Sequence, residues 1–225
     1  MSRAKILGNS TKMQMTEDKH PGTIFRAFSI PAGPEICRFC TFGPRCYTHY
    51  GRMSMAVQRN AYEENFEMVR DGTIWERLDK ELAALERKAK RDGAQVYIRV
   101  HDTGDYFSKA YIENWLEVAR DHPTIIFYSY TKAVGWIKEY MDFGEVPDNY
   151  RFVFSIGSTQ DIFLDEKDRV AGVFGEDRAV PPGWHDGSHD DYWAAQPEGN
   201  VFLRYHGPKT QAFTAIPAWM KEVVE

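Results

Sequence analysis

The fold class is decided by Val96-Tyr97-Ile98-Arg99-Val100 and the residues that follow it, His101-Asp102-Thr103-Gly104-Asp105-Tyr106-Phe107. The first five residues predict a buried strand, and the polar residues after them predict a loop. Ser108 is a favoured N-cap residue, and it precedes apolar residues at helical spacing. A nearly continuous apolar run over 125–130 predicts a second buried strand. The order strand, helix, strand predicts a parallel sheet with crossover helices.

Hydrophobic spacing also predicts elements before and after this region. It predicts helices over 55–69, 74–91 and 134–141, strands over 151–156, 170–174 and 201–205, and a long loop over 180–200. We therefore expect a single α/β domain over 1–225, built as a partial parallel β/α barrel or an open parallel sheet. Residues 1–54 are expected to form an N-terminal extension with a metal-binding cysteine loop. Residues 55–225 are expected to form the β/α core, with an irregular C-terminal part.

The composition excludes several classes of protein. Hydrophobic residues make up 43% of the 225 residues, which is enough for a core and excludes a disordered chain. A net charge of −5 disfavours binding of duplex nucleic acid over the whole surface. No apolar run is long enough to span a membrane, and the first residues lack the apolar region of a signal peptide. These features predict a protein of the cytoplasm.

Three cysteines lie within ten residues: Cys37, Cys40 and Cys46. An odd number of clustered cysteines excludes a disulfide framework, and thiolates are soft ligands for iron–sulfur clusters or zinc. Three thiolates could hold a [4Fe–4S] cluster and leave one iron open for a cofactor or substrate. Alternatively, His49 completes a Cys3His set for a structural zinc ion. A third interpretation, unmetallated buried thiols, is disfavoured by the neighbouring Gly43-Pro44 turn.

Polar residues follow each predicted strand, where the ligand sites of parallel sheets lie. They are His101, Asp102, Asp105, Thr131, Lys132, Ser155, Ser158, Thr159 and His206. We expect His101, Asp102 and Asp105 to act as acid or base groups or to hold a substrate, unless they only cap the helix and bond to backbone. Lys132 is expected to be a further catalytic residue that binds a carboxylate or phosphate, unless it is an ordinary surface lysine. The His185–Asp191 segment offers metal ligands but is more simply explained as a solvated loop.

Several segments together resemble the bacteriophage "gene product eighty-eight" family over residues 6–175. They are Leu7–Lys12, Phe28–Gly33, Cys46-Tyr47, Arg59-Asn60, Arg99–Ser108, Trp115 and Phe127–Lys132. The most specific of them is His101–Ser108. The resemblance implies a phage-encoded protein that works in the cytoplasm of the bacterial host.

That family in turn resembles the radical S-adenosylmethionine enzymes, which carry a three-cysteine loop before a partial parallel barrel. The resemblance implies that Cys37, Cys40 and Cys46 bind a [4Fe–4S] cluster. It also implies that Thr103, Gly104 and Asp105 replace the acidic segment that meets S-adenosylmethionine, and we expect Thr131 and Ser155 at the same edge to contact the cofactor. The cysteine spacing here, x2 then x5, departs from the usual x3 then x2, and the aromatic Tyr47 follows the last cysteine.

Two functions from different classes follow from these observations. The first is an iron–sulfur protein with redox or radical chemistry on an unknown small-molecule or macromolecular substrate. The second is a non-catalytic binding module, stapled by zinc, that acts on host protein or nucleic acid.

Overall fold

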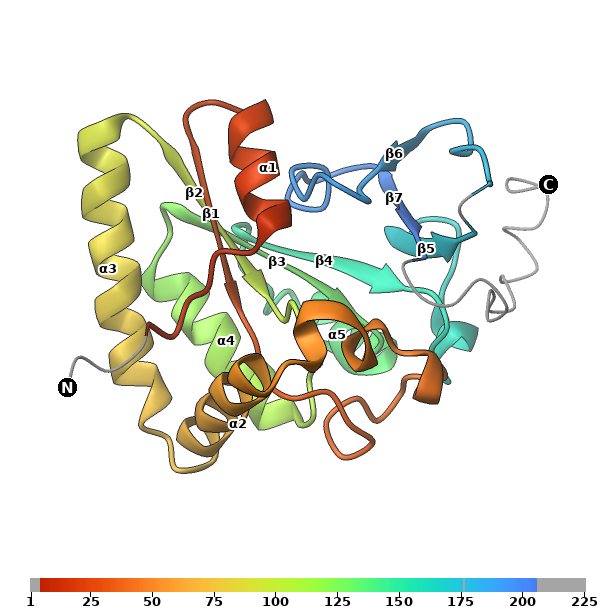
Figure 1. Ribbon diagram of the computed structural model, residues 1–225, viewed down its shortest axis with the longest axis horizontal. Coiled ribbons are helices and arrows are strands. Elements are labelled where there is room, and N and C mark those ends of the chain that lie inside the picture. The colour runs from red at the N-terminus through yellow and green to blue at the C-terminus, as the bar shows by residue number, and fades with distance from the viewer. Residues whose placement is uncertain (1–4, 176, 206–225) are drawn as a thin grey trace.

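The computed structural model describes residues 5–175 and 177–205. Within that part of the chain, one curled sheet of seven parallel strands runs in the order β1-β2-β3-β4-β5-β7-β6 (Figure 1). The sheet is open, with β1 and β6 as its edges, so the architecture is a parallel half-barrel. It confirms the predicted α/β class and its parallel sheet.

The strands are β1 (Thr23–Phe28), β2 (Gln95–Val100), β3 (Ile125–Thr131), β4 (Tyr150–Ser155), β5 (Val170–Phe174), β6 (Trp184–Asp186) and β7 (Asn200–Arg204). The helices are α1 (Thr11–Lys19), α2 (Ala56–Arg70), α3 (Ile74–Asp92), α4 (Lys109–Asp121) and α5 (Val134–Asp142). Short 3-10 turns are η1 (Gly43–Arg45), η2 (Tyr47–His49), η3 (Gly51–Ser54) and η4 (Asp161–Phe163). None of the described helices has the length and apolar character needed to cross a bilayer.

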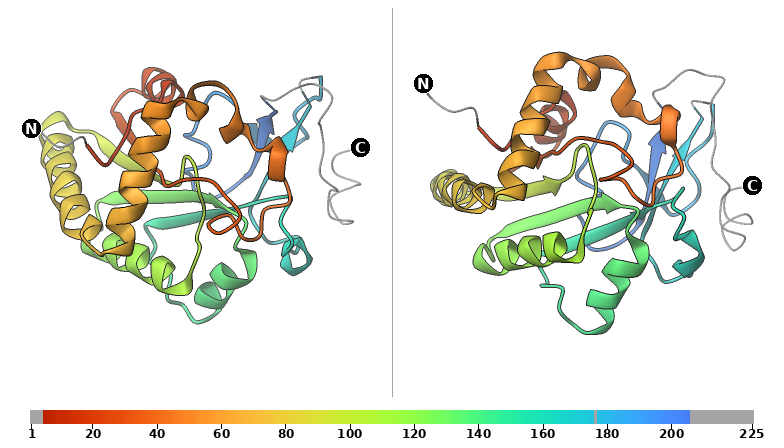
Figure 2. Two further views of the ribbon diagram at one scale, coloured as in Figure 1. Left: turned by 60° about the horizontal axis from the view of Figure 1, so that its bottom comes forward. Right: turned by 90° about the horizontal axis from the view of Figure 1, so that it is seen from below.

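Three helices, α3, α4 and α5, cover the convex face of the sheet (Figure 2). Ser108 caps α4 as predicted, because its hydroxyl accepts a hydrogen bond from the Tyr111 backbone N–H at 3.2 Å. Helix α3 ends at Gly93, which adopts the left-handed conformation with φ 64°. The apolar sides of these helices bury Leu78, Leu82 and Trp115 against alternate residues of the strands. The main hydrophobic core therefore lies between the sheet and these helices.

The concave face holds a smaller core that is filled by two segments from opposite ends of the chain. Met13 of α1 and Ala194 and Ala195 of the segment after β6 pack against Phe25 and Tyr128 of the sheet. Helix α1 and this segment thus cover the concave face, which in a closed barrel would be covered by further strands. Apolar residues on both faces of β2 and β3 explain why these strands are so easily recognised in the sequence.

Two regions differ from the sequence-based predictions. Residues 1–30 include α1 and β1, and β1 pairs with β2 in register from Thr23 with Gln95 to Phe28 with Val100. The predicted loop over 180–200 contains the three-residue strand β6. Neither strand shows a clear hydrophobic period in the sequence. Strand β6 is too short, and β1 is interrupted by Arg26, which pairs with Glu17 of α1 at 2.8 Å. The cysteine loop consequently follows the first strand of the sheet.

The role of α1 in closing the concave face can be tested with two methionines of one helix. Met13 is fully buried in the concave core, and Met15 is 38% exposed. We expect Met13→Ala to lower the free energy of unfolding by about 2–5 kcal/mol, because it leaves a cavity. Met15→Ala should change that energy by less than about 0.5 kcal/mol. Urea unfolding followed by circular dichroism measures both, and equal effects would show that α1 does not complete the core.

Candidate functional site

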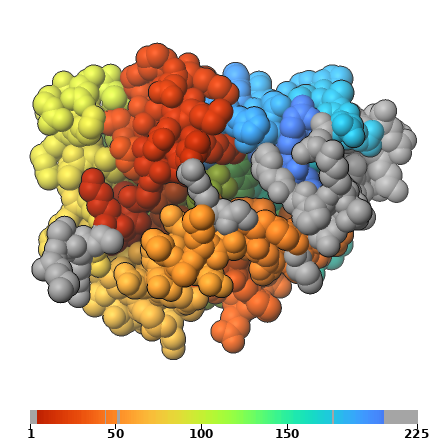
Figure 3. Space-filling model, in the orientation of Figure 1, coloured from red at the N-terminus to blue at the C-terminus, as the bar shows by residue number. Residues whose placement is uncertain are grey.

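A cavity of about 1340 Å³ opens at the carboxyl ends of the strands. It lies between α1 and α2, and Figure 3 shows a hollow between the red N-terminal segment and the orange segment that holds α2. All three cysteines, Cys37, Cys40 and Cys46, line it, together with Arg99, Asp102 and other residues at or just beyond the carboxyl ends of β2, β3 and β4. The structure thus brings the cysteine loop and the polar edge of the sheet into one site.

The cysteine loop begins at the end of β1 and lies against the loop that follows β2. The Ile30 backbone N–H donates to the Thr103 carbonyl at 3.3 Å, and the Thr103 hydroxyl donates to the Ile30 carbonyl at 2.7 Å. Gly104 has φ 87°, and a Cβ there would stand 2.5 Å from Ile30 Cγ1 and 3.0 Å from the Ile30 carbonyl oxygen. Only glycine permits this conformation and this approach at low cost. Thr103 and Gly104, predicted to bind a cofactor, therefore hold the start of the cysteine loop.

The middle of the cysteine loop is attached to the residues that follow β4. The Thr41 backbone N–H and hydroxyl both donate to the Gly157 carbonyl, at 3.0 and 2.7 Å. The Thr159 N–H donates to the Phe39 carbonyl at 2.8 Å, and Cys40 forms an isolated antiparallel bridge with Ser158. Cys40 is thereby placed above the end of β4.

The thiols are partly buried and close enough to influence one another. Burial is the main cause that raises the pKa of Cys37 to about 12, and the neighbouring Asp105, Cys40 and Cys46 raise it further. Burial also raises the pKa of Cys40, while the positive charge of Lys132 opposes the shift. In the metal-free protein, the thiols of Cys37 and Cys40 are therefore protonated at neutral pH. A bound metal would have to displace these protons, as thiolate sites generally require.

Asp105 and Lys132 form hydrogen bonds that join the ends of β2, β3 and β4. The Asp105 carboxylate accepts from the Thr131 hydroxyl at 2.7 Å and from the backbone N–H groups of Lys132 and Tyr106 at 2.9 and 2.8 Å. Lys132 Nζ donates to the Ser155 hydroxyl at 2.7 Å and to two backbone carbonyls at 3.0 Å. Burial raises the pKa of Asp105 and lowers that of Lys132. These contacts order the edge of the sheet, and the catalytic roles of both residues stay predictions.

His101 is a strained and buried residue at the end of β2. It is 2% exposed, and its φ of 71° is unusual for a residue other than glycine. Its Nε2 lies 2.9 Å from the Tyr111 hydroxyl, and within the described part of the chain Nδ1 has no hydrogen-bond partner. Burial, helped by the charge of Arg99, lowers the pKa of His101 to about 3. Its imidazole is therefore neutral near pH 7 and suits hydrogen bonding better than donation of a proton from the charged form.

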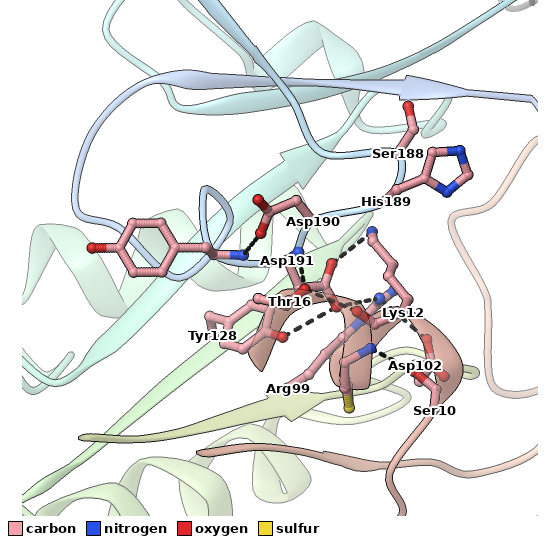
Figure 4. Close-up of polar contacts among 12 residues, drawn as sticks. Ser10, Lys12, Thr16, Arg99, Asp102, Tyr128, Ser188, His189, Asp190 and Asp191 are labelled. Carbon is pink, nitrogen blue, oxygen red and sulfur yellow. Dashed lines mark hydrogen bonds and ion pairs between the residues drawn. The ribbon is translucent and has the colours of Figure 1, made fainter. Parts of the chain in front are cut away.

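A network of buried charges, which the sequence did not reveal, lies next to the cavity and includes three of its lining residues, Lys12, Arg99 and Asp102 (Figure 4). The Asp191 carboxylate is fully buried and lies 2.6 Å from Lys12 Nζ of α1 and 3.0 Å from the Arg99 guanidinium. Arg99 also pairs with Asp102 at 3.1 Å, and the Tyr128 hydroxyl donates to Asp191 at 3.2 Å. Arg99 could have been suspected, because it is a charged residue within a buried strand, whereas Asp191 was considered only as part of the His185–Asp191 segment and not as a partner of Arg99.

Other predicted ligands lie apart from the thiols. His49 is exposed and is not among the residues that line the cavity, while His206 lies outside the described residues. In the His185–Asp191 segment, His185 stacks on Trp193 and Asp190 pairs with His20 at 2.9 Å, so the side chains do not converge. Over residues 5–175 and 177–205, no group of three or more His, Cys, Asp or Glu side chains is arranged around a single metal ion.

The fold and the site define an α/β half-barrel protein with a thiol-lined cavity at the carboxyl edge of its sheet. The chain belongs to the Gene product 88 family, whose model matches residues 3–217. It is similar to the Gene 88 proteins of Mycobacterium phage L5, at 26% identity over 118 residues, and of Mycobacterium phage D29, at 25% over 118 residues. Each alignment covers 49% of this chain and 48% of the phage protein, so the chain spans about half the length of these relatives. No solved structure matches the chain significantly.

These findings confirm the expected resemblance to the phage family. The expected relationship to radical S-adenosylmethionine enzymes stays a prediction.

The buried charge network can be tested by changing Asp191. Burial alone would raise the pKa of Asp191, but Lys12 and Arg99 lower it to about 2 from the usual 3.8. Asp191→Asn leaves Arg99 and Lys12 without this charge, and we expect it to lower the free energy of unfolding at pH 7 by about 3–5 kcal/mol. Asp165→Asn removes an exposed carboxylate that pairs with Lys138 at 3.0 Å, and it should change that energy little.

The pH dependence provides a second measurement of the same network. A carboxylate with a lowered pKa stabilises the folded protein fully above its unfolded pKa and loses that contribution as the pH falls toward its folded pKa. The wild type should therefore lose stability between pH 3.8 and about 2 through this group, and Asp191→Asn should lose less over that interval. Parallel pH profiles of the two proteins would contradict the assignment.

Proposed function

We propose that this protein binds a [4Fe–4S] cluster through Cys37, Cys40 and Cys46, with the fourth iron facing the cavity. The observation that carries the proposal is that three thiols from one loop line one cavity at the carboxyl edge of a parallel half-barrel. That edge is where open parallel sheets bind their ligands. The loop is attached to the ends of two strands on either side of Cys37 and Cys40, which holds these two thiols at this edge before any cluster binds.

The donor set fits an iron–sulfur cluster better than zinc. Thiolates bind both, but a single zinc ion with Zn–S bonds of about 2.3 Å requires four ligand atoms that converge on one point. The fourth ligand of the zinc alternative, His49, is exposed and does not line the cavity. A cluster is wider, needs only three thiolates here, and leaves one iron for a cofactor or substrate. The zinc-stapled binding module therefore has less support.

The positive charge of Lys132, next to Cys40, suits the binding of a negatively charged group at the thiols. Lys132 is the cation whose charge opposes the rise in the pKa of Cys40, and it lies over the Phe42 ring at 4.5 Å. Its ammonium is fixed by three hydrogen bonds, so it can balance the charge of thiolates without moving. We propose that Lys132 stabilises the deprotonated thiols rather than acting on a substrate.

The cavity also suits a small-molecule cofactor next to the cluster. Its volume exceeds the range of about 300–1000 Å³ that is usual for ligand pockets, so a cofactor and a substrate could share it. S-adenosylmethionine is the cofactor that we propose, and on a reduced cluster it supplies radical chemistry. Asp102 and Asp105 both line the cavity, but the oxygens of Asp105 accept from three donors, whereas in the described part of the chain Asp102 pairs with Arg99 alone and its side chain is partly exposed. Asp102 is therefore the better candidate to bind a cationic amino group.

The proposal predicts a brown protein when it is purified or reconstituted without oxygen. We expect about four irons and four sulfides per chain, with the visible absorbance of an iron–sulfur cluster. Cys37→Ser, Cys40→Ser and Cys46→Ser should each lose most of this iron, because every thiolate holds one iron atom. His49→Ala is the matched control and should keep it.

The opposite pattern would contradict the proposal. A colourless protein with one zinc ion, released by His49→Ala together with a large loss of stability, would establish the structural zinc site instead. Release of 5′-deoxyadenosine from S-adenosylmethionine by the reduced protein tests the cofactor separately. A loaded protein that never releases it would limit the proposal to the cluster alone.

A further inference from the structure

The three cysteines differ in how they are held against the sheet. Cys37 donates its backbone N–H to Gly33 at 2.7 Å, and its side chain packs against the main core. Cys40 is bridged to Ser158 and flanked by the bonds of Thr41 and Thr159. The first two thiols are therefore fixed by backbone contacts and by packing.

Cys46 has no comparable attachment of its own within the described part of the chain. Its backbone N–H donates to Gly43 at 3.1 Å and its sulfur lies 3.1 Å from the Thr48 hydroxyl, so both contacts are local. It lies on the segment 43–50, which consists of the 3-10 turns η1 and η2 and is followed by η3. Such short turns provide little rigidity by themselves.

One side chain joins this segment to the ordered edge of the sheet next to Cys46. The Tyr47 hydroxyl donates a hydrogen bond to the backbone carbonyl of Asp102, in the loop that follows β2. Asp102 is itself fixed, because its N–H donates to the Phe28 carbonyl at 3.1 Å and its carboxylate pairs with Arg99 at 3.1 Å. A longer contact of 3.4 Å, from the Tyr205 hydroxyl to the Arg45 carbonyl, supports the segment from the opposite side.

We propose that Tyr47 is a positioning residue that fixes the third thiolate, Cys46, over the carboxyl edge of the sheet. The inference rests on the proposed function, since the position of Cys46 matters only if the three thiolates share one cluster. Tyr47 does not touch the cluster in this account. It acts on the preceding residue, Cys46, through the chain and through its own hydrogen bond to Asp102.

The hydroxyl, rather than the ring, carries this role. Tyr47 is 41% exposed, so its ring contributes little to the core, while its hydroxyl reaches the cavity wall. Removing the hydroxyl should therefore loosen the segment 43–50 and leave the rest of the fold intact. A residue with only a structural role would lower the overall stability instead.

The test compares Tyr47→Phe with two control variants. Tyr62→Phe removes another hydroxyl from the same cavity, one that contacts Met53 Sδ at 3.1 Å. Thr41→Val removes the hydroxyl bond at the other end of the cysteine loop but keeps the backbone bond to Gly157. Thermal unfolding of the metal-free proteins serves as the folding check, and all three midpoints should lie close to that of the wild type.

Two measurements then follow the position of Cys46. In the metal-free protein, amide hydrogen exchange of residues 43–50 should be about two- to tenfold faster in Tyr47→Phe, the range expected for losing one hydrogen bond. In the protein loaded with iron and sulfide, transfer of iron to an excess of a chelator should be faster by about the same factor. Neither rate should change in Tyr62→Phe, and Thr41→Val should leave exchange over 43–50 unchanged.

The two measurements separate the inference from the proposed function. If the wild type takes up no iron, the proposed function fails, while the hydrogen-exchange result still shows whether Tyr47 fixes the segment. If the wild type binds a cluster and Tyr47→Phe matches it in both rates, the positioning role is overturned. The same holds if Tyr47→Phe loses stability without faster iron release, because the role would then be structural.

Discussion

The position of the three thiols depends on how the cysteine loop is attached to the carboxyl edge of the sheet. A loop that crosses the open end of a half-barrel would leave its backbone polar groups unsatisfied unless other groups bind them. Here the loop bonds to Thr103 beyond β2 and to Gly157 and Thr159 beyond β4. Gly104 makes room for the first of these contacts. The thiols therefore stand over the strand ends because the loop has its hydrogen-bond partners there.

Beneath this loop, buried polar groups bond to one another and hold the edge of the sheet together. Asp105 and Lys132 tie the ends of β2, β3 and β4 together, and Asp191 ties β2 to α1. Buried charges of this kind are costly unless they are paired. The cavity is lined by the three cysteines together with Arg99 and Asp102.

The sequence predicted those parts of the fold that carry a strong hydrophobic period. Helices α2 to α5 and strands β2 to β4 were found within one or two residues, because their apolar residues recur at regular spacing or fill both faces of the sheet. The rule for parallel sheets also placed the residues after β2, β3 and β4 at one edge. It could not show that Asp105 and Lys132 bind their neighbours, because that depends on side-chain geometry. The role of Asp191 was hidden for a further reason, since it comes from an irregular segment that reaches the sheet only after folding.

Mössbauer spectroscopy of protein loaded with ⁵⁷Fe under anaerobic conditions tests the central claim, that three thiolates hold a four-iron cluster with one iron open to the cavity. The account predicts a cluster in which one iron differs from the other three, and the spectrum of that one iron should change when a small ligand is added. Iron bound singly to sulfur, four irons with equivalent ligands, or no bound iron would contradict it.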